Sequence, residues 1–376
     1  MTKVMLGIVV LVLMTGCSKK SPYIKQRAYE EHSSRLHKSK DLFEFNKARR
    51  RYLTQKTRLQ EQAAKLWGND VKIASRYEYV KYSKNYKARA LINFQTGTIQ
   101  VETTASFAPK TILLKVIRTT ILNTMNPQNV DLFSDRDKVQ KGIPFLYKKV
   151  YDHEGQPIRW PWRAEKYANY LIQHGLKVDW VTTPSGKQKR YAVSFKMKKP
   201  KNYKLRDAPY MNYVRQYSKR FGINEALILG IIQSESHFNP YATSSIPAYG
   251  LMQVVPASAG ADAWAYLKGR AGRPSKRYLF NPKNNIEMGT AYLRMIFRQY
   301  LVKIKNLKSR EYCTIAAYNT GSGNVLRAFS KNRDKAFKKI NSMSPKAVYI
   351  HLKRHLPYKE TRRYLVKVTK AKNAFY

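Results

Sequence analysis

The sequence is short of cysteine and of acidic residues, and each shortage excludes a class of protein. Two cysteines, Cys17 and Cys313, stand in 376 residues, which excludes a small domain held together by disulfides. Cysteine and histidine nowhere have the spacing of metal ligands, so we expect no metal and no other cofactor. Asp and Glu total 23 against 72 Lys and Arg, a net charge of +49, so the surface attracts polyanions. Apolar residues form 43% of the chain, which indicates a globular protein.

The N-terminus has the features of an exported protein. Lys3 precedes an apolar run over residues 4–14, which is too short to span a bilayer as a helix. Small residues stand directly before a cysteine in Met14-Thr15-Gly16-Cys17. This arrangement resembles the bacterial lipoprotein signal, in which the peptide is cut before the cysteine and the thiol is acylated. An ordinary signal peptide with an incidental cysteine is the alternative.

This resemblance predicts where the protein works. Residues 1–16 would be the signal peptide, Cys17 the lipidated residue that anchors the chain to a membrane, and 17–40 a basic tether. Ser18 after the cysteine implies the outer membrane, with the protein facing the periplasm. An exported protein does not meet the genome, so nucleic acid is not an expected partner. Peptidoglycan carboxylates and the phosphates of lipopolysaccharide are the polyanions left for the basic surface.

The length suffices for two domains, each with its own core. Residues 91–94 and 98–101 alternate around Gln95-Thr96-Gly97 and predict a hairpin, followed by a helix over 109–123. With strands near 177–181 and 190–195, residues 41–200 are predicted to form an α+β domain. Residues 201–376 are predicted to be all-α, with helices near 206–220, 224–236, 256–268, 284–304, 310–318, 322–330 and 359–371.

Glu235 stands out on one of these helices. Asn224 is a good N-cap, and Ile228, Ile231 and Ile232 form an apolar stripe. Glu235 lies seven after Ile228 and four after Ile231, so it continues the stripe in the last turn of the helix. Burial and the helix dipole would both raise its pKa, which suits a general acid. A glutamate just past the buried arc, facing solvent, is the alternative from spacing alone.

Four motifs in order decide between these readings. They are Glu235-Ser236, Gly250-Leu251-Met252-Gln253, Ala317-Tyr318-Asn319 and Glu360-Thr361-Arg362-Arg363-Tyr364. The set resembles the lytic transglycosylases whose catalytic domain is similar to goose-type lysozyme, and it covers residues 205–376. In the N-terminal half, 79–82, 92–103 and 155–160 are similar to membrane-bound members of these enzymes. The resemblance implies a lysozyme-like all-α catalytic domain.

The resemblance also assigns roles to single residues. It implies that Glu235 is the catalytic acid/base and that substrate-binding residues are Ser236, Ser244, Met252, Gln253, Tyr318, Asn319 and Tyr364. Gly250 would let the backbone approach the glycan. Core packing is the alternative for Met252 and Tyr318. Thr320 stands where the family usually has glycine, which leaves the preference for particular sugars open.

The count of carboxylates favours a lyase. Most glycosidases need two carboxylates at the scissile bond, and Asp262 is the only other one near the site in sequence. By the resemblance, Glu235 would cleave the β-1,4 bond between N-acetylmuramic acid and N-acetylglucosamine and leave a 1,6-anhydromuramic end, with no water consumed. A goose-type lysozyme that uses water and Asp262 is one alternative. A non-catalytic, peptidoglycan-binding lipoprotein is another.

Overall fold

The computed structural model describes residues 49–124, 143–198, 210–244 and 247–375, with residues 43, 46, 47 and 132. Residues Phe45–Tyr376 form one compact unit, which contains every helix, strand and pocket described below. The predicted signal peptide, Cys17 and the tether lie outside the described residues. No helix in the described ranges is long and apolar enough to cross a membrane.

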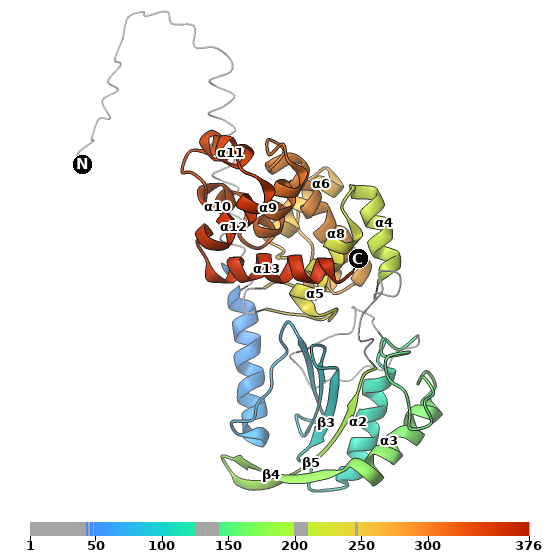
Figure 1. Ribbon diagram of the computed structural model, residues 1–376. Coiled ribbons are helices and arrows are strands. Elements are labelled where there is room, and N and C mark those ends of the chain that lie inside the picture. Colours follow the sequence, from blue (N-terminus) through green and yellow to red (C-terminus); the bar gives the residue numbers. More distant parts are fainter. Residues whose placement is uncertain are drawn as a thin grey trace, which may run out of the picture. The chain divides into compact units, whose positions relative to one another are not determined.

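The N-terminal half is built on a five-stranded antiparallel sheet in the order β1-β2-β3-β5-β4 (Figure 1). Its strands are β1 Glu78–Ser83, β2 Ala88–Asn93, β3 Thr98–Thr103, β4 Lys177–Thr183 and β5 Gly186–Lys196. Helices α2 (Pro109–Leu122) and α3 (Pro161–Gly175) pack on one face. A helix that ends at residue 67 packs on the other face through Trp67 against Val80 and Tyr82. Strand side chains alternate between the two faces, so one sheet serves both cores.

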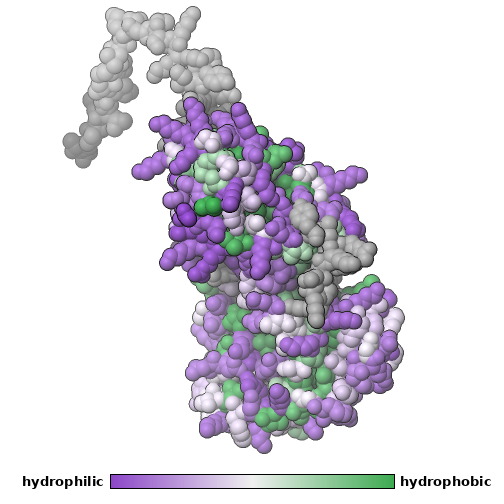
Figure 2. Space-filling model, in the orientation of Figure 1, coloured by the Kyte–Doolittle hydropathy of each residue, from purple (hydrophilic) through white to green (hydrophobic). Residues whose placement is uncertain are grey.

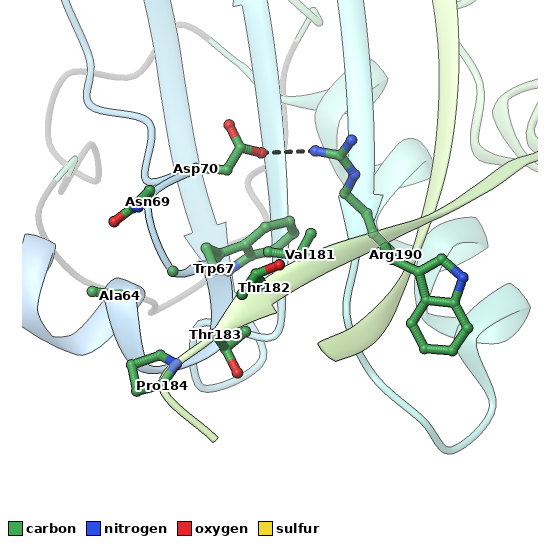
Figure 3. A pocket seen from close by; sticks show the side chains of 11 residues that line it. Ala64, Trp67, Asn69, Asp70, Val181, Thr182, Thr183, Pro184 and Arg190 are labelled. Atoms are coloured by element: carbon green, nitrogen blue, oxygen red, sulfur yellow. Dashed lines mark hydrogen bonds and ion pairs between the residues drawn. The ribbon is translucent and has the colours of Figure 1, made fainter. Parts of the chain in front are cut away.

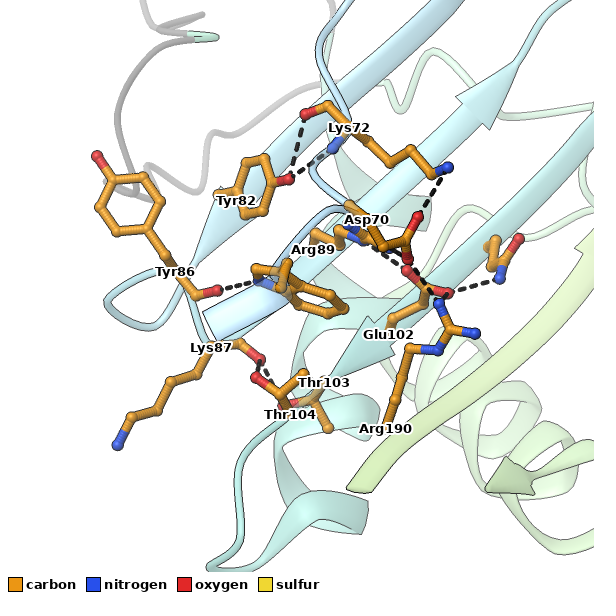
Figure 4. Close-up of polar contacts among 12 residues, drawn as sticks. Asp70, Lys72, Tyr82, Tyr86, Lys87, Arg89, Glu102, Thr103, Thr104 and Arg190 are labelled. Carbon is orange, nitrogen blue, oxygen red and sulfur yellow. Dashed lines mark hydrogen bonds and ion pairs between the residues drawn. The ribbon is translucent and has the colours of Figure 1, made fainter. Parts of the chain in front are cut away.

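Buried ion pairs tie the turn after this helix to the sheet (Figure 4). The Arg89 side chain is inaccessible to solvent and stacks on Trp67, 3.8 Å from the ring centroid. Its Nε donates to Glu102 Oε2 at 2.5 Å, and its Nη2 donates to Asp70 Oδ2 at 2.6 Å. Arg190 donates to the same Asp70 oxygen at 2.7 Å. Each buried charge therefore has an opposite charge beside it, which burial of ions requires.

The C-terminal half is helical (Figure 1). Helix α5 (Glu225–Ser236) is its central element and packs closely against α13 (Lys359–Asn373). The other elements are α4 Met211–Phe221, α6 Ala259–Lys268, α7 Lys276–Leu279, α8 Pro282–Met295, a π-helical turn η3 Ile296–Tyr300, α9 Leu307–Thr320, α10 Ser322–Arg327, α11 Arg333–Asn341 and α12 Pro345–His355. Hydrophilic side chains cover most of the visible face of this half in Figure 2.

The predicted fold class, an α+β domain followed by an all-α domain, is confirmed. The hairpin, the helix near 109–123 and the strands near 177–181 and 190–195 are where the sequence predicts them. Strand β1 and helices α3, α11 and α12 were not predicted. The helix expected over 284–304 ends at Met295 and continues as the π-helical turn. Residues 206–209 of the helix expected at 206–220 lie outside the described residues.

Candidate active site

Glu235 lies at the buried end of α5. The Asn224 side chain accepts a hydrogen bond from Leu227 N at 3.1 Å, which caps the start of the helix. Residues 226–232 are all buried, so the helix runs through the core. His237 and Phe238 follow with φ of 50° and 64°, and this left-handed turn ends the helix sharply. The Glu235 side chain is 5% exposed, so the predicted core-facing position is confirmed.

The Glu235 carboxylate lines a pocket of about 370 Å³, to which both halves of the unit contribute residues. Elements far apart in sequence contribute to it: the segment before β1, the loop after α5, and the ends of α9 and α13. Its lining residues are Arg76, Glu235, Ser244, Ala248, Gln253, Val255, Tyr318, Asn319, Thr320, Asn324, Tyr358, Glu360 and Thr361. The lining combines polar side chains with the rings of Tyr318 and Tyr358, so it suits a ligand that has both polar groups and flat ring faces.

The surroundings of Glu235 make it a weak acid. Burial raises its pKa from 4.5 to about 7, because desolvation disfavours the ionised form. The charges of Arg76 and Lys367 and the Tyr364 hydroxyl lower it, and the charge of Glu360 raises it. A carboxyl group with a pKa of about 7 can both give and take a proton near neutral pH.

Tyr318 and Asn319 stand side by side at the end of α9 and line the pocket. The Tyr318 hydroxyl donates to the Met252 carbonyl at 2.8 Å, and its burial raises its pKa well above 10, so it stays protonated. Asn319 Oδ1 accepts a hydrogen bond from Thr361 Oγ1 at 2.7 Å, which ties the end of α9 to the start of α13. Thr320 lines the pocket as well, with its carbonyl bonded to Asn324 Nδ2 at 2.8 Å.

Gln253 and Ser244 lie on the loop that follows α5. Gln253 has φ of 48°, and its Nε2 donates to the carbonyls of Ala242 and Gly250 at 3.0 Å each. Its Oε1 is buried and has no hydrogen-bond partner among the described residues. Both Gln253 and Ser244 line the pocket. Two hydrogen bonds from Nε2 thus fix the orientation of the Gln253 amide at the edge of the pocket.

Ser236 and Met252 do not line the pocket. The Ser236 hydroxyl donates to the carbonyls of Ile232 and Leu251, at 3.1 and 2.8 Å, and is fully buried. The Met252 side chain is fully buried against Gly289, whose missing Cβ leaves the space for it. The expectation that the Met252 side chain binds substrate is wrong, because that side chain packs in the core, the alternative that the sequence left open. Only its carbonyl reaches the site, through Tyr318.

Gly250 is needed for internal packing. Its φ is 77°, and a Cβ there would stand 2.3 Å from Asn285 Nδ2 and 2.4 Å from the Leu279 carbonyl. The close approach is therefore to Asn285, not to a glycan, and the sequence-based explanation is wrong. Asn285 was missed by sequence reasoning, because an asparagine inside a helix carries no distinguishing pattern.

Tyr364 and Lys367 approach Glu235 from α13. The Tyr364 hydroxyl is buried, interacts with the Glu235 carboxylate and lowers its pKa, yet it has no well-aligned hydrogen-bond partner in the described ranges. Lys367 Nζ donates to the Ser234 carbonyl at 2.8 Å. Tyr364, which the resemblance implies binds substrate, is not part of the pocket lining, and its hydroxyl acts on the Glu235 carboxylate instead.

Two charged residues of the pocket were not predicted. Arg76, from the segment before β1, has Nη1 3.9 Å from Glu235 Oε2 and 3.7 Å from Glu360 Oε1. Glu360 lies in the first turn of α13 and lines the pocket. Asp262, the second carboxylate that the sequence suggested, is exposed in the first turn of α6 and is not part of the pocket lining. Glu360 is thus the second carboxylate of this site.

A larger pocket, of about 610 Å³, lies between the helix that ends at residue 67 and strand β4 (Figure 3). Its carboxylate, Asp70, faces Arg190 across the pocket. Burial acts to raise the pKa of Asp70, but Lys72 and Arg89 outweigh it and hold the pKa below its usual value. Such a group cannot serve as a general acid near neutral pH. In the described part of the chain, no group of three His, Cys, Asp or Glu residues could hold a metal.

Two family models match the chain. Residues 45–208 match the N-terminal domain of membrane-bound lytic murein transglycosylase C, and residues 212–341 match the transglycosylase SLT domain. A protein named membrane-bound lytic murein transglycosylase C from Photorhabdus laumondii is 46% identical over 313 residues, which cover 83% of this chain and 86% of that one. Its namesake from Klebsiella pneumoniae is 45% identical over 312 residues, covering 82% and 85%.

Two solved structures resemble the chain over 44% of its length and 24% of theirs, each with a TM-score of 0.34. One is an inactive mutant of the lytic transglycosylase Slt from Pseudomonas aeruginosa, at 27% identity. The other is the 70 kDa soluble lytic transglycosylase from Escherichia coli, at 24% identity.

Proposed function

This chain belongs to the membrane-bound lytic murein transglycosylase C family, as its motifs predicted, and we propose that it cleaves peptidoglycan glycan strands with Glu235 as the catalytic acid/base. The bond cut is the β-1,4 bond between N-acetylmuramic acid and N-acetylglucosamine, and no water is consumed. The observation that carries this proposal is a buried carboxyl group with a pKa of about 7 at the base of an extended pocket. Cell-wall turnover and remodelling is the process that such a reaction serves.

The reaction has two proton transfers through one residue. Protonated Glu235 gives its proton to the glycosidic oxygen as the bond from that oxygen to C1 of the muramic residue breaks, with the N-acetyl oxygen assisting departure. Glu235 then takes the proton of the C6 hydroxyl, whose oxygen bonds to C1 and closes the 1,6-anhydro ring. The carboxyl group ends protonated, ready for the next cycle. A pKa near the working pH suits both steps.

The remaining pocket residues suit the binding of N-acetylated sugars. Gln253 and Asn319 line the pocket, where hydroxyl and N-acetyl groups would lie, and their amides offer both donors and acceptors. The Tyr318 ring lines the pocket, and its hydroxyl donates a hydrogen bond to the Met252 carbonyl. Ser244, Gln253, Tyr318 and Asn319 are our proposed substrate contacts, Tyr364 acts on Glu235, and Ser236 and Met252 support the loop from inside.

A goose-type hydrolase is the second candidate, and Glu360 is the observation that favours it. Glu235 and Glu360 both lie within 4 Å of the same Arg76 nitrogen, and a hydrolase needs a second carboxylate to activate water. Glu360 is, however, 70% exposed and paired with Arg76. A non-catalytic wall-binding protein would have no use for a buried, weakly acidic carboxyl group, whose burial costs stability.

Product masses separate the two reactions. We expect the soluble products from digested peptidoglycan to be 1,6-anhydromuropeptides, lighter by one water than lysozyme products. The reason is that the C6 hydroxyl is held next to C1, so it reacts ahead of solvent water. Mass spectrometry of the released fragments is the measurement. Asp262→Asn should change the rate little, because Asp262 is not part of the pocket lining.

Glu360→Gln is the sharper companion variant. It should still give anhydro products at a rate within about tenfold of the wild type, since the glutamate is not needed to activate water. Reducing-end muramic products as the main species, with activity abolished in Glu360→Gln, would place this protein among the hydrolases.

The relatives are named membrane-bound, and we propose that Cys17 anchors this chain to the outer membrane on its periplasmic side. The apolar run and the small residues before Cys17 support this. Mature Cys17→Ala protein should be absent, because neither acylation nor cleavage before residue 17 can occur. Metabolic labelling with a fatty acid and N-terminal mass analysis measure both events, with Cys313→Ala as the matched control. A Cys17→Ala protein that is still lipid-modified would contradict the proposal.

A further inference from the structure

The N-terminal half contributes a side chain directly to the pocket that holds Glu235. Arg76 belongs to the segment between the first helix and β1, yet its guanidinium Nη1 lies 3.9 Å from Glu235 Oε2. The same nitrogen lies 3.7 Å from Glu360 Oε1. The side chain is 32% exposed and lines the pocket. Arg76 is therefore the cation placed between the two carboxylates of the site.

The backbone on both sides of Arg76 is fixed to the loop that follows α5. The Arg76 carbonyl accepts a hydrogen bond from Asn239 Nδ2 at 3.2 Å, and the Ser75 carbonyl accepts one from Thr243 N at 3.4 Å. Asn239 is fully buried. The loop that carries pocket residues thus also sets the position of the Arg76 backbone.

Tyr77 makes a second attachment, to the end of α5 itself. Its hydroxyl donates to the Ser234 carbonyl at 3.3 Å, one residue before Glu235. Lys367 Nζ of α13 donates to the Tyr77 hydroxyl at 3.0 Å, and the Tyr77 ring packs edge-on against His237 with centroids 4.7 Å apart. Contacts on both neighbours of Arg76 therefore fix the backbone from which the guanidinium reaches the carboxylate.

The charged and titratable groups around Glu235 come from three elements. Arg76 approaches from the N-terminal half, Lys367, Glu360 and Tyr364 come from α13, and Tyr318 comes from α9. After burial, the charge of Arg76 is the largest influence on Glu235 and opposes the effect of burial. An acid that stayed protonated too firmly could not act as the base in the second proton transfer.

We propose that Arg76 is a positioning residue, supplied to the active site by the N-terminal domain, whose charge keeps both the acid and the base forms of Glu235 available to the reaction. This inference rests on the proposed function, in which Glu235 performs both proton transfers. It gives the N-terminal domain a part in the chemistry, because the catalytic pocket is incomplete without the segment before β1.

The test is the pH dependence of kcat/KM in the full-length protein, with soluble glycan strands as substrate. In the wild type, kcat/KM falls at high pH as Glu235 loses its proton. Arg76 favours the ionised form, so Arg76→Gln should move this alkaline limb to higher pH. We expect about one pH unit, the low end of the roughly 1–3 units typical of a neighbouring charge, because the guanidinium is partly exposed. Arg76→Lys should restore most of the wild-type profile.

Two further variants control for charge and folding. Arg118→Gln removes an equal charge from the N-terminal half at a residue paired with Glu165, outside the pocket, and should leave the limb in place. Glu360→Gln removes the negative charge that raises the pKa of Glu235, so it should move the limb to lower pH. If Arg76→Gln does not fold, as judged by circular dichroism, Arg76→Met replaces it, because methionine keeps an unbranched side chain without the charge and should move the limb in the same direction.

A uniform loss of activity at every pH in Arg76→Gln, with an unmoved limb, would overturn the inference and leave Arg76 a structural residue. The proposed function fails separately, if a protein without the Glu235 carboxyl group remains active.

Discussion

Glu235→Gln is expected to lower kcat/KM by about 10²–10⁴-fold while the fold stays intact. The amide keeps the shape of the side chain but has no transferable proton, and general acid–base catalysis is typically worth that factor. The side chain is 5% exposed and neutral near pH 7 for part of the time, so a neutral isostere suits its surroundings. Release of soluble muropeptides from purified sacculi, measured over time, gives the rate.

The same variant should be more stable than the wild type at alkaline pH. Burial raises the pKa of Glu235 from 4.5 to about 7, so its stabilising protonated form is complete below pH 4.5 and is lost as pH rises through 7. The wild type therefore loses up to roughly 3 kcal/mol of unfolding free energy that Glu235→Gln does not lose. Urea denaturation at pH 5 and pH 8 measures this difference.

Glu225→Gln is the matched control, because it makes the same change in the first turn of the same helix. It should retain activity and gain no stability between pH 5 and pH 8. More than about a tenth of the wild-type rate in Glu235→Gln would remove Glu235 from its role, since the expected loss is at least ~10²-fold.

Glu235 was predictable because a local helical pattern and the motif set pointed to the same residue. A helix period puts position 235 on the face of Ile228 and Ile231, and the structure buries all three. Tyr364 and the pocket-lining Tyr318 and Asn319 were predictable only through a resemblance, since their own sequence context suits core packing equally well. The Met252 side chain shows this limit, because the motif pointed to the cleft and the structure puts the side chain in the core.

Arg76 and Glu360 had no signal that sequence analysis could use. Arg76 is one of 72 basic residues and reaches Glu235 only because the N-terminal half folds against the loop after α5. Glu360 belongs to one of the four motifs, but it lies 125 positions after Glu235 in the sequence. Nothing in the sequence indicates that both carboxylates lie beside Arg76. Strand β1 was missed because Lys81 and Ser83 interrupt its apolar pattern, and cross-strand pairing with β2 overrides that local composition.

Asn285→Leu is expected to lower the free energy of unfolding by roughly 3–5 kcal/mol and to reduce activity as well. Asn285 is fully buried on α8, where its Oδ1 accepts from Met252 N at 2.8 Å. Its Nδ2 donates to the carbonyls of Tyr249 and Leu279, each at 2.8 Å. Leucine has a similar size but leaves Met252 N and the Leu279 carbonyl without the Asn285 bonds, and each such loss costs about 1–3 kcal/mol before the loop relaxes. The Tyr249 carbonyl keeps its hydrogen bond from Val254 N at 3.1 Å.

Activity should fall because Asn285 holds the backbone of a loop segment that carries pocket residues. The segment from Tyr249 to Gln253 carries the Gln253 side chain and the Met252 carbonyl that fixes Tyr318. Asn284→Leu is the matched control, because Asn284 is the neighbour on the same helix and its side chain makes one 3.4 Å bond to the Tyr278 carbonyl. It should cost less than about 1.5 kcal/mol, the net worth of an ordinary hydrogen bond.

Urea denaturation of both variants, paired with their rates of muropeptide release, tests this account. Asn285→Asp should fall between the wild type and Asn285→Leu, since its carboxylate can still accept from Met252 N but cannot donate to either carbonyl. Equal losses of stability in Asn285→Leu and Asn284→Leu would mean that the loop is held by its own contacts. The alignment of Gln253 and Tyr318 would then arise from the turn at Gly250, whose φ is 77°.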